Sequence, residues 1–232
     1  MRIIVIGATG TIGTAVADEL ERRHEVVRVS RRGSMGGSMG GSVEGSLEGP
    51  VEGSLEGSLG ADLCDTASID ALLDRVGRVG GVDAVVCCAA SGTLTPLDDP
   101  SDAAFWTGLD GKLVGQVNLV RHALARLRDG GSVTLTSGRF AEPVPGSSMG
   151  HLVNAGLEAF VRAAAVELPR GLRLNAVSPG WVRETLVSLG MDPAGGVPAA
   201  EVARVYAQAV EGSFTGRTLA VQAVTRGEST AS

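Results

Sequence analysis

The chain has 232 residues, of which 44% are hydrophobic and 20% are charged, and its formal net charge is −6. This composition fits one globular domain and excludes wholesale disorder. The acidic balance argues against a nucleic-acid-binding protein, because neutralising phosphates requires a dense basic surface.

No apolar run reaches the roughly 18 residues that a membrane helix requires, and the apolar run near residue 1 is too short for a secretory signal. We therefore expect a cytoplasmic protein with no membrane partner. The three cysteines are Cys64, Cys87 and Cys88. Their number is odd and their spacing does not suit a metal, so we predict free thiols, buried at Cys87 and Cys88, and no metal site.

Strand patterns and helix patterns alternate along the chain. Strands are predicted at residues 2–7, 25–30, 82–88, 132–136, 172–177 and 218–224. Helices are predicted at residues 11–23, 66–78, 102–127, 149–168 and 199–210, and Thr66 or Ser68 is the expected N-cap of the second helix. Such alternation is typical of βα units around a parallel sheet. We predict an α/β fold, a doubly wound parallel sheet in a single domain over residues 1–232.

A four-residue repeat fills residues 33–60, as seven units that read GSMG, GSMG, GSVE, GSLE, GPVE, GSLE and GSLG. Glycine at this frequency opposes a helix by about 1 kcal/mol per residue. The even period places the aliphatic residues on one face of an extended chain. We predict a flexible insertion after the second strand. An added strand and a lid over a bound ligand are the alternatives.

The first strand runs directly into a glycine-rich loop, and a helix follows it. Glycines at spacing G-x-x-G-x-x-G allow a tight turn and a close approach to a pyrophosphate, which the helix N-terminus then binds. In this strand–loop–helix context the motif predicts dinucleotide binding, with an ordinary glycine turn as the alternative. The candidate cofactor-binding residues are Gly7, Thr9, Gly10, Thr11, Ile12 and Gly13.

The end of the second strand distinguishes between the two nicotinamide dinucleotides. An acidic residue there would accept hydrogen bonds from a ribose 2′-hydroxyl, but this chain has Ser30-Arg31-Arg32. A hydroxyl and two guanidinium groups suit a 2′-phosphate. The sequence therefore predicts NADP (NADPH) as the cofactor, and a solvated basic pair is the alternative.

These motifs resemble those of the short-chain dehydrogenase/reductase family over residues 2–224, apart from the repeat. The resemblance implies a Rossmann fold of about seven strands in the order 3-2-1-4-5-6-7, and a homodimer or homotetramer. It also implies further cofactor contacts from segments that match the family pattern. These are Asp62 and Leu63 after the third strand, Cys88-Ala89-Ala90 after the fourth, Asn154 on the helix that follows the fifth, and Pro179, Gly180 and Val182 after the sixth.

The family's catalytic Tyr-x-x-x-Lys motif is missing, because the chain has one tyrosine, Tyr206, and one lysine, Lys112. The resemblance places Gly150 at the tyrosine position and Asn154 at the lysine position. It places Lys112 where the family has an asparagine on its fourth helix, so the ammonium group points either into the site or along the helix into solvent.

Ser137 follows the predicted fifth strand, as the family's catalytic serine does, although a register shifted by one residue would put Gly138 there instead. His151 is expected at the surface or at an interface. The catalytic candidates are therefore Ser137 and Lys112.

We predict an NADP-dependent oxidoreductase with an altered proton donor. A non-catalytic NADP-binding protein and a non-redox enzyme on the same fold are the alternatives. The resemblance implies a substrate lid at residues 183–197, and a plain packed loop is the alternative. Leu186, Val187, Leu189 and Met191 in that stretch suggest an apolar carbonyl or alcohol as the small-molecule substrate.

Overall fold

A computed structural model describes residues 1–31, 59–89, 94–98, 101, 106 and 108–221. Its seven strands form one parallel sheet in the order β3-β2-β1-β4-β5-β6-β7, which confirms the predicted doubly wound fold. The strands are β1 (Arg2–Ile6), β2 (Glu25–Ser30), β3 (Leu59–Gly60), β4 (Val82–Cys87), β5 (Leu127–Thr136), β6 (Arg173–Pro179) and β7 (Thr218–Val221).

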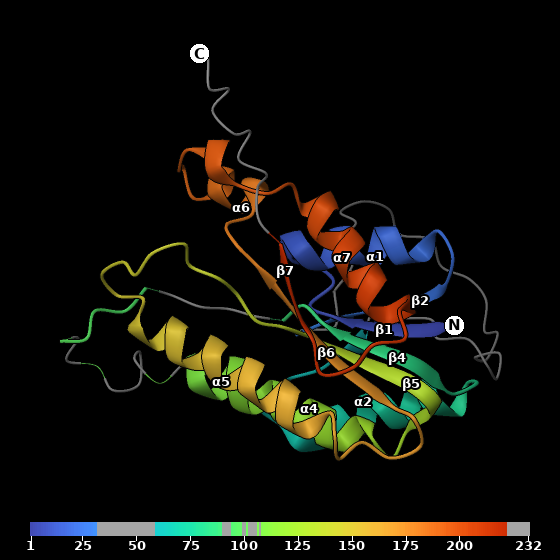
Figure 1. The fold of residues 1–232 in the computed structure, drawn as a ribbon. Coiled ribbons are helices and arrows are strands. Elements are labelled where there is room, and N and C mark those ends of the chain that lie inside the picture. The colour runs from blue at the N-terminus through green and yellow to red at the C-terminus, as the bar shows by residue number, and fades with distance from the viewer. Residues whose placement is uncertain (32–58, 90–93, 99–100, 102–105, 107, 222–232) are drawn as a thin grey trace, which may run out of the picture.

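Helices cover both faces of the sheet (Figure 1). One face carries α1 (Thr11–Glu21) and α7 (Ala199–Glu211). The other carries α2 (Thr66–Arg78), α4 (Gly115–Ala123) and α5 (Ser148–Ala164). The π-helical turn η1 (Leu109–Val114) leads into α4, and the short helices α6 (Arg183–Ser188) and η2 (Pro193–Gly195) follow β6. Among the helices of the described residues, none combines the length and apolar character needed to cross a membrane.

The central strand β1 is buried on both faces, which explains its unbroken run of apolar residues. Ile4 and Ile6 belong to the hydrophobic cluster beneath α2, α4 and α5. Ile3 and Val5 belong to the cluster beneath α1 and α7. All four side chains are at most 1% exposed, so each β1 residue after Arg2 contributes to one of the two cores.

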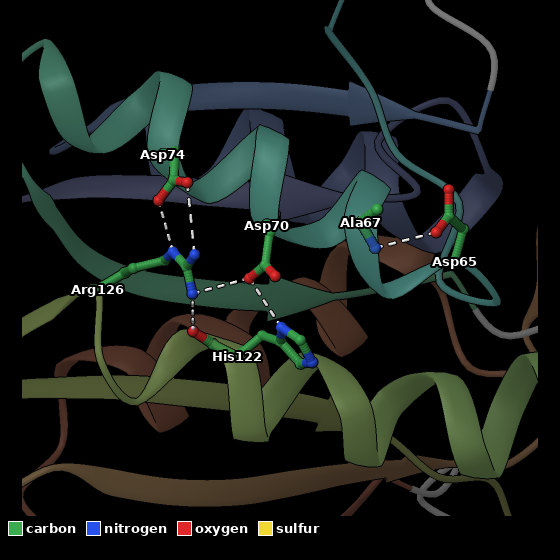
Figure 2. A network of polar contacts seen from close by, with 6 residues as sticks. All are labelled: Asp65, Ala67, Asp70, Asp74, His122 and Arg126. Atoms are coloured by element: carbon green, nitrogen blue, oxygen red, sulfur yellow. Dashed lines mark hydrogen bonds and ion pairs between the residues drawn. The ribbon is translucent and has the colours of Figure 1, made fainter.

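A polar network joins α2 to α4 at the surface (Figure 2). Asp70 lies 2.7 Å from His122 Nδ1 and 2.8 Å from an Arg126 guanidinium nitrogen, while Arg126 Nε donates to Asp74 at 2.7 Å. Asp65 is the N-cap of α2, since its carboxylate accepts from the Ala67 N–H at 2.9 Å. The predictions of Thr66 or Ser68 as the cap are therefore wrong. Carboxylates cap helices well because they satisfy unpaired N–H groups.

The helix predicted over residues 102–127 is too long at its carboxyl end. The helical part ends at Ala123, and β5 begins at Leu127, which pairs with Val82. The sequence Asp129-Gly130-Gly131 resembles a turn, yet it lies within β5. Gly131 is required there, because a Cβ at this position would lie 2.7 Å from the Asp83 carbonyl oxygen.

The end of the repeat supplies the edge strand of the sheet. Leu59 and Gly60 pair with Val29 and Ser30, and Leu59 is buried. The alternative of an added strand therefore holds for these two residues. The rest of the predicted insertion, over 33–58, lies outside the described residues, as does the predicted strand beyond Val221.

Candidate active site

Two glycines of the predicted dinucleotide loop allow backbone segments to approach closely. Gly7 has φ +83°, in the left-handed region, and a Cβ there would lie 2.6 Å from the Ala89 nitrogen. A Cβ at Gly13 would lie 2.0 Å from the Gly7 carbonyl oxygen. The N-cap of α1 is Gly10, which has no side chain to accept hydrogen bonds from the N–H groups of the first turn. This cradle fits a dinucleotide pyrophosphate.

The carboxyl end of β2 lies beside this loop, because the Gly7 and Ala8 N–H groups donate to the Val29 carbonyl at 2.8 and 3.0 Å. Ser30 and the exposed Arg31 follow Val29 at the same edge. Arg32 lies outside the described residues. Of the predicted phosphate-binding pair, the structure therefore places Arg31 beside the loop.

Asp62 and Leu63 follow β3 on the same edge of the sheet. The Asp62 carboxylate accepts from the Cys64 N–H at 3.0 Å, and Leu63 is buried. Ala89 contributes the backbone against which Gly7 packs, and Ala90 lies outside the described residues. The predicted cofactor residues of β1 to β4 thus share one edge, because parallel strands align their carboxyl ends.

A cavity of about 280 Å³ opens next to the glycine loop. It runs between the carboxyl ends of β4, β5 and β6, the η1 turn and the start of α5. Of the predicted site residues it includes Ile12, Cys88, Lys112, Ser137 and Asn154, together with Pro179, Gly180 and Val182. The structure therefore places both catalytic candidates and six of the eighteen predicted cofactor-binding residues in one cavity.

Lys112 and Asn154 form the polar centre of this cavity. The Lys112 Nζ donates to the Asn154 Oδ1 at 2.7 Å, and Asn154 is buried. Of the two alternatives for Lys112, the structure therefore has the ammonium in the cavity wall. Gly138 leaves room for this pair, because a Cβ there would lie 3.4 Å from Lys112 Nζ and 3.3 Å from Asn154 Nδ2.

Burial lowers the pKa of the Lys112 ammonium to about 8, while the negative forms of Cys87 and Glu158 oppose that change. An ordinary lysine has a pKa near 10.4 and stays charged throughout the physiological range. At neutral pH, Lys112 is therefore mostly protonated yet able to release its proton readily, as a general acid requires.

Ser137 borders the cavity with its hydroxyl already bound. Its Oγ donates to Glu158 Oε1 at 2.7 Å, and the same oxygen accepts from Ser178 Oγ at 3.0 Å. The position that directly faces Lys112 and Asn154 is Gly138. Ser137 and Gly138 both line the cavity, so the choice between the two registers stays a prediction.

Phe140 fills the space in front of Gly150. A Cβ at Gly150 would lie 2.9 Å from Phe140 Cε2 and 3.1 Å from Cζ. The Phe140 ring lies 4.9 Å from the His151 ring and 6.5 Å from Trp181, which it meets edge-on at 80°. His151, predicted at a surface or interface, is half-buried in the single chain, and its Nε2 has no hydrogen-bond partner among the described residues.

The single tyrosine lies outside the cavity. Tyr206 of α7 is fully buried, and its hydroxyl lies 2.5 Å from Thr136 Oγ1, which also donates to the Cys87 carbonyl. Burial raises the pKa of Tyr206 and of Cys88 well above their ordinary values and that of Cys87 to about 12. The three cysteines are free, as predicted, although Cys88 is only half-buried and Cys64 is exposed. These groups hold their protons at neutral pH, which leaves Lys112 as the better proton donor.

Backbone contacts to three other parts of the chain fix the segment at the end of β6. The Pro179 carbonyl accepts from the Arg139 N–H at 2.9 Å, the Gly180 N–H donates to Val221 at 3.0 Å, and Val182 pairs with Val197. Within the predicted lid stretch, Leu186 is buried, whereas Val187, Leu189 and Met191 are exposed.

Sequence reasoning missed Phe140 and Trp181, which line the cavity, and Glu158, which binds Ser137. The two aromatic residues carried a signal. Aromatic residues make up only 3% of the chain, and both of these stand in loops after parallel strands, where ligands bind. Glu158 carried no signal, since an acid on a helix is usually solvated.

A family model described as enoyl-(acyl carrier protein) reductase matches residues 7–222. Together with the fold and the solved structures below, this match shows that the chain belongs to the short-chain dehydrogenase/reductase family. The protein lin1944 from Listeria innocua has a crystal structure with a TM-score of 0.78 and 32% identity, which covers 95% of this chain and 99% of that one. A small-chain dehydrogenase in complex with NADPH has a TM-score of 0.72, covers 96% of each chain and, at 24% identity, shows the fold alone.

Two curated relatives match over shorter stretches. The (5R,7aS)-5-hydroxy-7a-methyl-1-oxo-2,3,5,6,7,7a-hexahydro-1H-indene-carboxyl-CoA reductase of Mycobacterium tuberculosis is 34% identical over 128 residues, 53% of this chain and 49% of that protein. The NADH-dependent enoyl-[acyl-carrier-protein] reductase FabI of Synechocystis is 33% identical over 134 residues, 55% and 52% respectively. The chain thus aligns with about half the length of these relatives.

Proposed function

We propose that the chain is an NADP-dependent oxidoreductase of small carbonyl compounds in which Lys112 replaces the family's tyrosine as the proton donor. The observation that carries this proposal is the contact of Lys112 Nζ with Asn154 Oδ1 at 2.7 Å inside the cavity. Lys112 is the only lysine of the chain, so no other ammonium side chain competes for the role.

The nucleotide would be held by the Gly7–Gly13 loop and by the segment after β6. When bound, NADPH supplies the hydride of the reaction. One relative is named for NADH and one similar structure holds NADPH, so neither decides between the two. The preference for NADP rests on Ser30-Arg31-Arg32, of which Arg31 is exposed at the edge beside the loop.

Lys112 would stabilise and then protonate the oxygen of the substrate. A buried ammonium stabilises developing negative charge more strongly than one in water, because the surrounding dielectric is lower. Asn154 accepts one of its hydrogen bonds and thereby orients it, while Gly138 leaves open space beside both groups. With a pKa of about 8, the ammonium can give up its proton and recover it from solvent near neutral pH.

The two residue types also occupy exchanged positions. The family pattern has asparagine on the fourth helix and lysine on the helix after the fifth strand, and this chain has Lys112 and Asn154 there. Because the two side chains touch, the exchange keeps one ammonium and one amide in the same part of the cavity. The exchange supports the proposal that the Lys112 ammonium supplies the positive charge that the family's lysine supplies from the other helix.

The test measures binding of NADPH and NADH by calorimetry, then loss of NADPH absorbance with a panel of ketones, aldehydes and enones. Lys112→Met should lower kcat by about 10²- to 10⁴-fold, the usual contribution of a general acid, with NADPH affinity within about threefold. The control Arg162→Met removes an exposed cation from α5 and should leave both unchanged. Replacing Arg31 and Arg32 with alanine should weaken NADPH binding far more than NADH binding.

Three results would count against the proposal. Normal turnover by Lys112→Met would assign the proton to Ser137 or to water. Equal losses for both nucleotides in the double arginine variant would remove the NADP preference. Tight NADPH binding without reduction of any compound would favour the non-catalytic or non-redox alternative.

A further inference from the structure

The Phe140 ring is held in place by three neighbours. It packs over Gly150 at a distance that leaves no room for a Cβ, with 2.9 Å from the Cβ position to Cε2. The His151 ring lies 4.9 Å away and tilted by 36°, and Trp181 meets the ring edge-on at 6.5 Å. These contacts come from α5 and from the segment after β6, so elements on two sides of the cavity fix the orientation of the ring.

Phe140 lines a cavity that also has several large apolar side chains in its wall, namely Trp181, Met149, Val153 and Leu94. Lys112 and Asn154 provide a polar centre in the same cavity. The cavity therefore offers a ligand both a partner for its oxygen, at Lys112, and apolar side chains for the rest of the molecule.

We propose that Phe140 is the specificity-determining residue of the cavity, where its ring takes the space of a side chain at position 150 and selects ligands with a flat, conjugated apolar group next to the oxygen. This inference rests on the proposed function, in that it takes the cavity as the substrate site. Aromatic rings prefer offset-stacked or edge-to-face contacts with other rings, and each such pair adds to what area burial provides. Because the Phe140 ring is already fixed, binding a ligand costs little conformational entropy in this side chain. More of the favourable contact energy with a flat group therefore contributes to the binding affinity.

Gly150 and the Phe140 ring compete for the same space. A Cβ at position 150 would displace the far end of the Phe140 ring, so the two positions should behave as a coupled pair. Position 150 lies within α5, where alanine is a better helix former than glycine. Gly150→Ala should therefore disturb the ring without weakening the helix.

The test uses calorimetry with cinnamyl alcohol and 1-hexanol, with and without saturating NADPH. Both ligands are already reduced, so they bind without reacting, and neither forms an imine with Lys112. The parent should prefer cinnamyl alcohol by about tenfold or more. Phe140→Ala, and Phe140→Leu as a variant that keeps an apolar side chain, should both reduce this preference to about threefold or less.

The coupled pair supplies the second measurement. Gly150→Ala alone should lower the affinity for cinnamyl alcohol, because the new Cβ displaces the ring. Added to Phe140→Leu, it should have little further effect. The control Gly156→Ala lies on the same helix, where a Cβ would be 3.4 Å from the nearest Leu113 atom, and it should bind both alcohols like the parent.

An unchanged preference in both Phe140 variants, or additive effects of the two positions, would overturn the inference. These outcomes are separate from the proposed function, because the binding of the alcohols is measured without turnover. A Phe140→Ala variant that fails to fold leaves Phe140→Leu and Gly150→Ala to decide the matter.

Discussion

The two ends of the proposed site are built in different ways. The proposed nucleotide end is the glycine loop beside the cavity, and it is made of backbone, where Gly7 and Gly13 let chain segments approach within distances that no side chain would allow. The proposed reacting end is the cavity itself, which is lined by side chains, and there Lys112, Asn154 and Gly150 all depart from the family pattern. The nucleotide end keeps the family's glycines, and its close backbone contacts require residues without a side chain.

This difference shows which properties of the reacting end are kept. The exchange of Lys112 and Asn154 keeps one positive charge in the cavity. The pairing of Phe140 with Gly150 keeps the volume filled. A site made of side chains can thus be rebuilt by paired changes, whereas a site made of backbone contacts has few alternatives.

The largest expected effect of a single substitution on stability is at the nucleotide end. Gly13→Ala places a Cβ 2.0 Å from the Gly7 carbonyl oxygen, so the loop must shift. We expect a loss of about 3 kcal/mol or more in the free energy of unfolding, together with loss of NADPH binding. The control Gly77→Ala lies in α2, where nothing is within 4 Å of the new Cβ, and should be neutral or stabilising by up to about 1 kcal/mol. Similar melting curves for the two variants would contradict the backbone account.

A substitution at the reacting end, Lys112→Met, should instead increase the stability of the protein. Burial lowers the pKa of Lys112 to about 8, so below that pH the folded protein carries an unfavourable charge that the unfolded chain tolerates. Lys112→Met should therefore raise the free energy of unfolding at pH 7, by up to about 3 kcal/mol. Between pH 8 and about 10.4 the unfolded chain binds more protons than the folded one, so the parent gains stability with rising pH. The advantage of the variant should shrink over that window. Urea titrations at pH 7 and pH 9.5 measure this, and an equal or growing advantage at pH 9.5 would refute it.

The same contrast explains what could be predicted from the sequence. The β2 and α2 bounds were predicted correctly, because apolar periodicity marks which face is buried. The glycine loop between β1 and α1 can be found from the sequence because its three glycines lie only three residues apart, and its binding of a nucleotide stays a prediction. The side of the helix on which Lys112 lies was left open, because it depends on Asn154, 42 positions away. Phe140 was missed, because its role depends on the absence of a side chain at Gly150.

The most direct test of the central claim is a pH titration of Lys112 itself. The chain contains one lysine, so growth with lysine labelled with ¹³C at Cε gives a single side-chain signal in a carbon–proton NMR spectrum. The account predicts a midpoint near pH 8, because the ammonium is buried beside Asn154. A midpoint at or above the ordinary lysine value of about 10.4 would place the ammonium in solvent and remove it from the site.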